Sequence, residues 1–146
     1  MVDVDGTVAE TYTTNLLPGV QEFFHLVFYG TCPHSPQIAL ATNQGGVGLR
    51  RWMETAGFGE PDKYPTLEDI ESRLAELSSL LAEGKKLNVY ASFSYQSHQG
   101  QWSPIPKGME QDLPWSYEWR KPGPGMLLQA MQEAGVKPEK NSVRRR

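Results

Sequence analysis

Two carboxylates near the start of the chain could do phosphoryl-transfer chemistry together. Asp3 and Asp5 stand at i and i+2 in the segment 1–7, so an extended chain points both side chains the same way. Two neighbouring negative charges favour a bound cation, and Mg²⁺ takes oxygen ligands. One carboxylate could attack phosphorus while the other acts as general acid and base. An Asp-Gly pair is also ordinary turn chemistry, so both interpretations stay open for this segment alone.

Two later segments carry groups that suit a phosphate. Thr42 and Asn43 follow a short apolar run, where a hydroxyl and an amide can hold phosphate oxygens or cap a turn. Arg120 and Lys121 stand directly before a predicted helix, and a lysine there offers a compact positive charge to a phosphoryl group. The alternative for Lys121 is a solvated side chain in a Pro-Gly loop.

The predicted elements bring these segments to one edge of a sheet. Apolar runs predict strands that end near residues 4, 41 and 93, and helices are expected over 17–27, 49–55, 66–84 and 122–134. Alternating strands and helices predict an α/β fold with a parallel sheet and right-handed crossovers. Ligands on such sheets bind beyond the carboxyl ends of the strands. We therefore expect the chemistry just after Val4, after Ala41 and near the loop that follows Phe93.

Side-chain patterns define the third helix best. Thr66 and Asp69 predict a capping box, and an apolar stripe follows at spacings of three and four: Leu67, Ile70, Leu74, Leu77 and Leu81. In the last helix we expect Leu127, Leu128 and Met131 to point inward, and Val143 to begin another strand. The segment 96–116 is predicted to be a long loop, a feature that is often functional.

The three motifs together resemble those of the haloacid dehalogenase superfamily of phosphohydrolases. They are the segments 3–7, 41–44 and 120–127, the last reading Arg-Lys-Pro-Gly-Pro-Gly-Met-Leu. The third motif is similar to the branch that contains histidinol-phosphate phosphatase and heptose bisphosphate phosphatase, with the polynucleotide 3′-phosphatase domain as a neighbour. The resemblance covers nearly the whole chain. It implies a single domain over 1–146 and a three-layer Rossmann-like parallel sheet flanked by helices.

The resemblance also implies a role for each candidate residue. Asp3 would be the nucleophile that forms an aspartyl-phosphate, and Asp5 would protonate the leaving oxygen and then activate water. The Asp3 carboxylate and the Asp5 backbone carbonyl would bind Mg²⁺. Thr42 and Asn43 would contact the phosphate, Lys121 would stabilise charge in the transition state, and Arg120 would grip substrate phosphate.

Two departures from the family pattern affect the expected site. The fourth motif, usually Gly-Asp-x-x-x-Asp, is missing, because Arg144-Arg145-Arg146 follows Val143 with no further Asp. We therefore expect a fragment without the last strands, or an incomplete metal site that an acidic loop residue such as Asp112 or Glu118 would have to complete. Zinc is not expected, since the loop before the third motif holds His98 and no Cys.

A cluster of aromatic residues stands in the place where relatives hold zinc. Trp115, Tyr117 and Trp119 form either a wall that faces substrate or packing that replaces the zinc. Cys32 and His34 lie in another loop and lack partners there.

Composition excludes several other classes. Without its last three arginines the chain has 11 Lys and Arg against 17 Asp and Glu, and this net charge of −6 argues against a general nucleic-acid binder. The single Cys excludes a disulfide framework. No apolar run predicts a membrane span and no signal peptide is visible, so a cytoplasmic location is expected. The resulting hypothesis is a Mg²⁺-dependent phosphatase for a small phosphorylated metabolite, such as a sugar phosphate or a histidinol phosphate-like compound. The alternatives are a relative that binds phosphate ligands without turnover, and a polynucleotide 3′-phosphatase.

Overall fold

The computed structural model describes residues 1–31 and 37–137. Its helices and strands follow one another along the chain in this order: α1 (Val20–Tyr29), β1 (Ala39–Asn43), α2 (Gly45–Ala56), η1 (Pro61–Lys63), α3 (Leu67–Ala82), β2 (Asn88–Ser92), η2 (Leu113–Trp115), η3 (Tyr117–Trp119) and α4 (Gly125–Glu133). The predictions made for Cys32, His34 and Val143, and for the arginines at 144–146, concern residues outside this description. In the described ranges, no helix has both the length and the apolar character needed to cross a membrane.

The sheet of the described chain is small and parallel, as the predicted α/β class requires. β1 pairs with β2 in a register that runs from Ala39 opposite Asn88 to Asn43 opposite Ser92. The first segment lies beside β1, because the Val2 amide donates to the Ala39 carbonyl at 2.9 Å and the Ala41 amide donates to the Val2 carbonyl at 2.8 Å. The parallel α/β prediction is therefore confirmed for these elements.

The first predicted strand is shorter than expected. Only an isolated bridge joins Val2 to Leu40, because the chain turns immediately after Val4. The Val4 carbonyl accepts the amides of Thr7, Val8 and Ala9 at 3.2, 2.9 and 3.1 Å, which folds the segment back on itself. The turn leaves Asp3 beside the edge of β1 and Asp5 within the turn.

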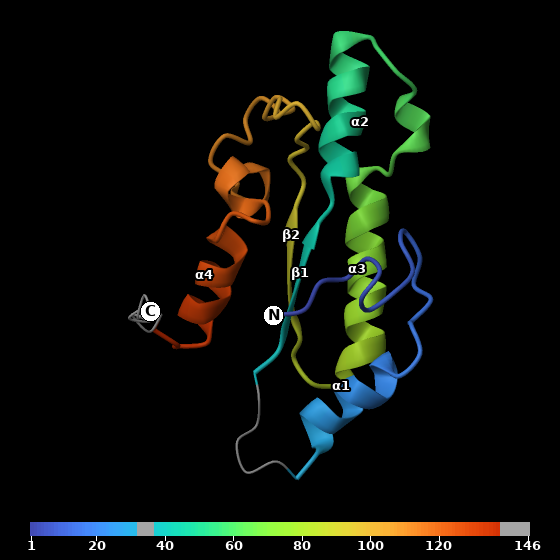
Figure 1. The fold of residues 1–146 in the computed structure, drawn as a ribbon, viewed down its shortest axis with the longest axis vertical. Helices are drawn as coiled ribbons and strands as arrows, with labels where there is room; N and C mark the ends of the chain where they lie inside the picture. Colours follow the sequence, from blue (N-terminus) through green and yellow to red (C-terminus); the bar gives the residue numbers. More distant parts are fainter. Residues whose placement is uncertain (32–36, 138–146) are drawn as a thin grey trace, which may run out of the picture.

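Helices cover both faces of the sheet. Figure 1 shows α4 on one side of the two strands and α2 and α3 on the other. Side chains alternate accordingly, as they must in strands: Leu40 packs in the cluster with the α3 residues Ile70 and Leu77, whereas Ala41 packs with Met126 of α4. Because helices cover both faces of these strands, the short apolar runs of β1 and β2 have no polar face.

The predicted start and apolar face of α3 are confirmed. Thr66 accepts the Asp69 amide at 3.1 Å, and Asp69 accepts the Thr66 amide at 3.1 Å, so the capping box is complete. The stripe residues Ile70, Leu74, Leu77 and Leu81 are buried. The helix is therefore stabilised at its end by the cap and along its length by packing.

α2 starts earlier than predicted. It begins at Gly45 rather than near Leu49, and Gly48 lies inside it. A Cβ on Gly48 would lie 2.3 Å from the Phe93 carbonyl oxygen, so the glycine lets the helix approach the end of β2 closely. The contact outweighs the low helix propensity of glycine. Helix propensities along the sequence do not predict it, because it is a tertiary contact.

The predicted inner face of α4 is wrong for its two leucines. Leu127 and Leu128 are each 48% exposed and Met131 is half-buried, whereas Met126 is 1% exposed and packs against the sheet. Ala130 stands one turn after Met126 and packs in the same cluster. The small side chain at 130 lets the helix approach β1 and β2, so the contact stripe runs through 126 and 130 rather than through the leucines.

The aromatic cluster near residue 117 packs rather than lining an open wall. Trp115 and Trp119 are 3% and 7% exposed, and the Trp119 indole donates to the Ala91 carbonyl at 2.9 Å. Tyr117 stacks on Trp102 with ring centroids 4.4 Å apart. These contacts fasten the predicted loop 96–116, which ends in η2, onto the end of β2. They favour the packing interpretation.

Candidate active site

An ion pair joins the first and third motifs. The Lys121 Nζ atom lies 2.8 Å from Asp3 Oδ1 and donates to the Ala41 carbonyl at 2.9 Å. The Val4 amide donates to the same Asp3 oxygen at 2.8 Å. The Asp3 and Lys121 side chains are 49% and 34% exposed, so a ligand in solvent can reach both. A carboxylate and an ammonium are thus held together at the carboxyl end of β1.

Asn43 fixes the backbone of the third motif. Its amide nitrogen donates to the Lys121 carbonyl at 3.0 Å, and its amide oxygen accepts the Lys121 amide at 2.9 Å. The side chain therefore pairs with one residue in both directions. This pairing places Lys121 beside Asp3, and it commits the Asn43 amide to the protein rather than leaving it to a phosphate.

Asp5 is held by two buried side chains. Its Oδ1 lies 2.7 Å from Arg73 Nη2, and its Oδ2 accepts from Gln44 Nε2 at 2.6 Å. The Tyr12 amide also reaches Oδ1, at 3.4 Å. The Asp5 side chain is 22% exposed. Both oxygens of the predicted acid and base therefore accept hydrogen bonds, so a proton on either requires a rearrangement of its partner.

Thr42 lies beneath this site. The residue is 1% exposed, and its Oγ1 accepts from Gln44 Nε2 at 2.8 Å. Gln44 thus bridges Thr42 to Asp5. In this arrangement the Thr42 hydroxyl supports the glutamine and is covered from solvent.

Arg120 spans the ends of β2 and α2. Its Nη1 donates to the Ser94 carbonyl at 3.1 Å, and a Cβ on Gly45 would lie 2.9 Å from the same nitrogen. The guanidinium therefore lies directly against the backbone of Gly45, the first residue of α2. Burial lowers the pKa of the Arg120 guanidinium below its ordinary value. The arginine adds positive charge beside a helix N-terminus, which itself favours anions.

The structure thus brings the sequence-predicted residues into two adjoining groups. One contains Asp3, Lys121 and Asn43, and the other contains Asp5 and Thr42, joined through Gln44. They adjoin because Asp3 and Asp5 are two residues apart and Thr42 and Asn43 are consecutive. Arg120 precedes Lys121, but its guanidinium bonds to the carbonyl of Ser94.

Sequence reasoning missed Arg73. The residue stands within the apolar stripe of α3, three residues after Ile70 and four before Leu77, and it is 7% exposed. A charged residue on the buried face of a helix is rarely placed there without a partner. This interruption of the stripe is the signal that could have identified it.

Tyr12 is a second residue that the sequence did not indicate. Burial, and next the nearby Asp5 carboxylate, raise the pKa of the Tyr12 phenol above its ordinary value. A Cβ on Gly46 would lie 3.3 Å from the Tyr12 hydroxyl, so the phenol lies against the first turn of α2. It forms one border of the Asp5 group.

The donor atoms present fit a magnesium ion that keeps waters and a substrate phosphate among its ligands. In the described chain, no hydrogen bond reaches Asp3 Oδ2 or the Asp5 backbone carbonyl. Mg²⁺ is usually bound by one or two carboxylates together with substrate oxygens. Within residues 1–31 and 37–137, no three His, Cys, Asp or Glu residues gather to hold a metal. Asp112 and Glu118 therefore do not complete the site here.

Comparison with protein-family models, with curated proteins and with solved structures gives no match for this chain.

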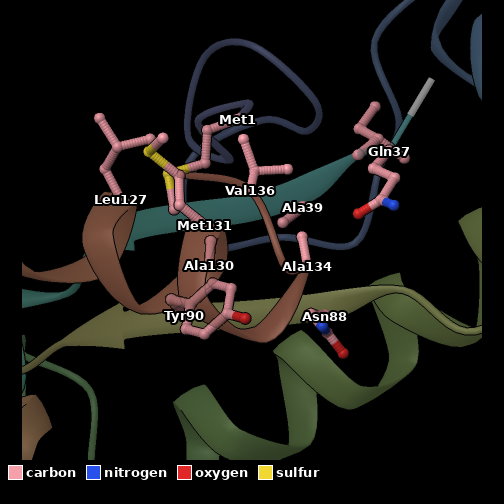
Figure 2. A pocket seen from close by; sticks show the side chains of 11 residues that line it. Met1, Gln37, Ala39, Asn88, Tyr90, Leu127, Ala130, Met131, Ala134 and Val136 are labelled. Atoms are coloured by element: carbon pink, nitrogen blue, oxygen red, sulfur yellow. The ribbon is translucent and has the colours of Figure 1, made fainter. Parts of the chain in front are cut away.

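An apolar hollow lies away from these residues. It has a volume of about 170 Å³ and is bordered by Ile38, Ala39 and Asn88, at the amino ends of the strands. Figure 2 shows Leu127 and Met131 of α4 around it. Ligands of parallel α/β sheets bind at the carboxyl ends instead. The charged groups described above lie at that other end, which makes it the candidate active site.

Proposed function

We propose that this chain is a Mg²⁺-dependent phosphomonoester hydrolase that uses Asp3 as its nucleophile. The observation that carries the proposal is the ion pair of 2.8 Å between Asp3 and Lys121, which unites residues from opposite ends of the chain at the carboxyl end of β1. A structural ion pair needs no particular place in a sheet, whereas a catalytic one belongs at this edge. The substrate class is a small phosphorylated metabolite, a sugar phosphate or a histidinol phosphate-like compound.

The proposal extends to the fold family of the domain, its cellular location and its class of substrate. We infer a haloacid dehalogenase-like domain whose sheet is part of a three-layer Rossmann-like arrangement, supported by the helix-covered faces of β1 and β2. The single Cys is consistent with a cytoplasmic location. The net charge of −3 favours a metabolite over a polynucleotide, because strand binding needs a basic track.

The first step transfers the phosphoryl group to the protein. An Asp3 carboxylate oxygen forms a bond to phosphorus while the bond from phosphorus to the ester oxygen breaks. The departing oxygen takes the proton of the Asp5 carboxyl, which leaves an alcohol, an aspartyl-phosphate at residue 3 and an Asp5 carboxylate. The Lys121 ammonium, 2.8 Å from Asp3, stabilises the charge that develops on the phosphoryl oxygens.

The second step releases phosphate. A water oxygen forms a bond to phosphorus, the Asp5 carboxylate takes a proton from that water, and the bond from phosphorus to Asp3 breaks. The products are inorganic phosphate, the Asp3 carboxylate and a protonated Asp5, so the starting state returns. When bound to the Asp3 carboxylate and the Asp5 carbonyl, Mg²⁺ supplies charge neutralisation for the phosphate group.

The remaining residues support these steps in different ways. Asn43 holds the Lys121 backbone, and Thr42 holds Gln44 against Asp5. Arg120 lies beside the N-terminus of α2, where a guanidinium and helix amides can hold phosphate oxygens. We therefore assign phosphate contact to Arg120 and positioning to Asn43 and Thr42.

One observation favours a second candidate, a protein that binds phosphate ligands without turnover. Both oxygens of Asp5 accept hydrogen bonds from Arg73 and Gln44, which leaves the carboxylate less free to exchange protons. Such a protein would keep the Lys121 and Arg120 charges and bind phosphate, with no release of product.

Phosphate release by the whole chain tests the proposal. Sugar phosphates, histidinol phosphate and an aryl phosphate would be supplied with and without Mg²⁺. We expect Mg²⁺-dependent release that Asp3→Asn abolishes and Asp62→Asn leaves unchanged, since the Asp62 side chain is 94% exposed and, within the described residues, forms an ion pair with Arg50 alone. Folded wild-type chain that binds phosphate but releases none would contradict hydrolysis and support the binding protein.

A further inference from the structure

We propose that Arg73 is a positioning residue that orients the Asp5 carboxylate for its proton transfers. The inference rests on the proposed function and deepens it, because it adds a residue from α3 to a site otherwise built at the strand ends. Arg73 reaches Asp5 from a distant part of the chain, with its Nη2 2.7 Å from Asp5 Oδ1. None of the three sequence motifs contains it.

One guanidinium holds both Asp5 and the segment that follows it. Arg73 Nε donates to the Thr13 carbonyl at 2.6 Å, and Nη2 donates to the Glu10 carbonyl at 3.2 Å as well as to Asp5. The donors of a guanidinium have a fixed planar geometry. The path of residues 10–13 and the direction of the Asp5 carboxylate are therefore set together.

Gln44 holds the other side of the carboxylate. Its Nε2 lies 2.6 Å from Asp5 Oδ2, and the residue is only 2% exposed. Arg73 is 7% exposed, so neither partner can turn toward solvent while keeping its other bonds. Two buried groups on opposite oxygens restrict rotation of the Asp5 side chain. Such restriction keeps an acid and base aligned with its reaction partner.

Packing of the core does not by itself explain an arginine at this position. Arg73 Nη1 and Gln44 Oε1 are buried without a hydrogen-bond partner in the described residues, which costs free energy. A buried ion pair is often no more stabilising than apolar side chains of similar volume. The neighbours of Arg73 on this face are apolar, so a leucine or methionine would continue the stripe. The arginine is explained by its polar partners, which are the carbonyls of Glu10 and Thr13 and the Asp5 carboxylate.

The test compares Arg73→Met and Arg73→Lys with wild type in steady-state phosphate release. We expect Arg73→Met to lower kcat roughly 100-fold, the scale of a misplaced catalytic group, with KM changed less than about threefold. A purely structural role would not confine the loss to kcat in this way. Arg73→Lys keeps the charge without the planar fork, so it should recover only part of kcat.

Arg50 provides a matched control. It also joins carboxylates to two backbone carbonyls, since it bonds to Glu54, Asp62, Pro61 and Tyr64, but it makes no hydrogen bond to Asp5 in the described residues. Arg50→Met should keep the wild-type kcat and KM. Thermal unfolding of every variant shows whether it is folded. If Arg73→Met does not fold, the kcat of Arg73→Lys decides the question.

The outcomes separate this inference from the proposed function. Wild-type kcat or a loss confined to KM in folded Arg73→Met, or a full recovery in Arg73→Lys, would overturn the positioning role and leave the phosphatase proposal standing. An equal loss in Arg50→Met would also overturn it, because the effect would then report general loosening. A wild-type chain without turnover would overturn the proposed function, and the positioning role with it.

Discussion

Lys121 is the residue on which the chemistry of the site most depends. Its ammonium contacts the Asp3 carboxylate and the Ala41 carbonyl, and its backbone is paired on both sides with Asn43. Such a charge is preorganised, because it needs no rearrangement as negative charge develops on a phosphoryl group. Asn43 at the end of β1 holds the Lys121 backbone, so the end of this strand sets the position of the ammonium.

Replacing Lys121 with methionine should separate its charge from its packing. We expect kcat to fall roughly 100- to 1000-fold, the usual effect of removing one group that stabilises a developing oxyanion. Steady-state kinetics of the folded variant provide the measurement, with the exposed Lys107→Met as the control. Activity within a few-fold of wild type would show that Lys121 is only a structural partner of Asp3.

For single residues, the sequence predicts which polar side chains follow the strands, but it does not predict which side chains hydrogen-bond to them. Asp3 and Lys121 could be placed together because each stands at a predicted strand end or helix start. The partners of Asp5 could not be predicted, because they depend on how α3 is rotated against the first segment. The Asn43 pairing with Lys121 likewise depends on a close approach of two loops rather than on residue type.

The helices show which features of an element are predictable from sequence and which depend on tertiary contacts. The Thr66 and Asp69 cap and the stripe from Ile70 to Leu81 were readable because they are local and periodic. The early start of α2 was not, since Gly48 is explained by its contact with the Phe93 carbonyl. The inner face of α4 failed for the same reason, because the small Ala130 rather than the leucines sets its approach to the sheet.

Removing the cap of α3 should destabilise the whole chain. Thr66→Ala is expected to lower the free energy of unfolding by about 1 kcal/mol, measured by denaturant unfolding near neutral pH. α3 carries both Arg73 and much of the core, so a weaker helix should unfold with the rest. An unchanged midpoint would contradict a contribution from the cap.

The same variant should change the pH dependence of stability. Hydrogen bonds from the Thr66 side chain and backbone hold the pKa of Asp69 below its ordinary value of 3.8. The stabilisation is therefore complete above that pH and is lost as the pH falls through the lower folded-state value. The stability difference between wild type and Thr66→Ala should shrink under these acidic conditions. A constant difference at all pH values would contradict the linkage.

The whole molecule places its charged groups and its apolar hollow at opposite ends of the sheet. Asp3, Lys121 and Arg120 lie near the carboxyl ends of β1 and β2, whereas the hollow is bordered by Ile38 and Asn88 at the amino ends. The α/β class could be predicted because the alternation of strands and helices is a property of the entire sequence. Because β1 and β2 run parallel, their carboxyl ends lie at one edge of the sheet and their amino ends at the other. A single sequence motif does not reveal this pairing.

Covalent trapping at Asp3 tests the central claim of this account most directly. The wild-type chain would be mixed with Mg²⁺ and a phosphomonoester and quenched with borohydride, which reduces an aspartyl-phosphate to homoserine. Peptide mass spectrometry is then expected to find homoserine at residue 3, and none in Asp3→Asn or in wild type without substrate. Phosphate release by wild type with residue 3 always recovered as aspartate would contradict Asp3 as the nucleophile.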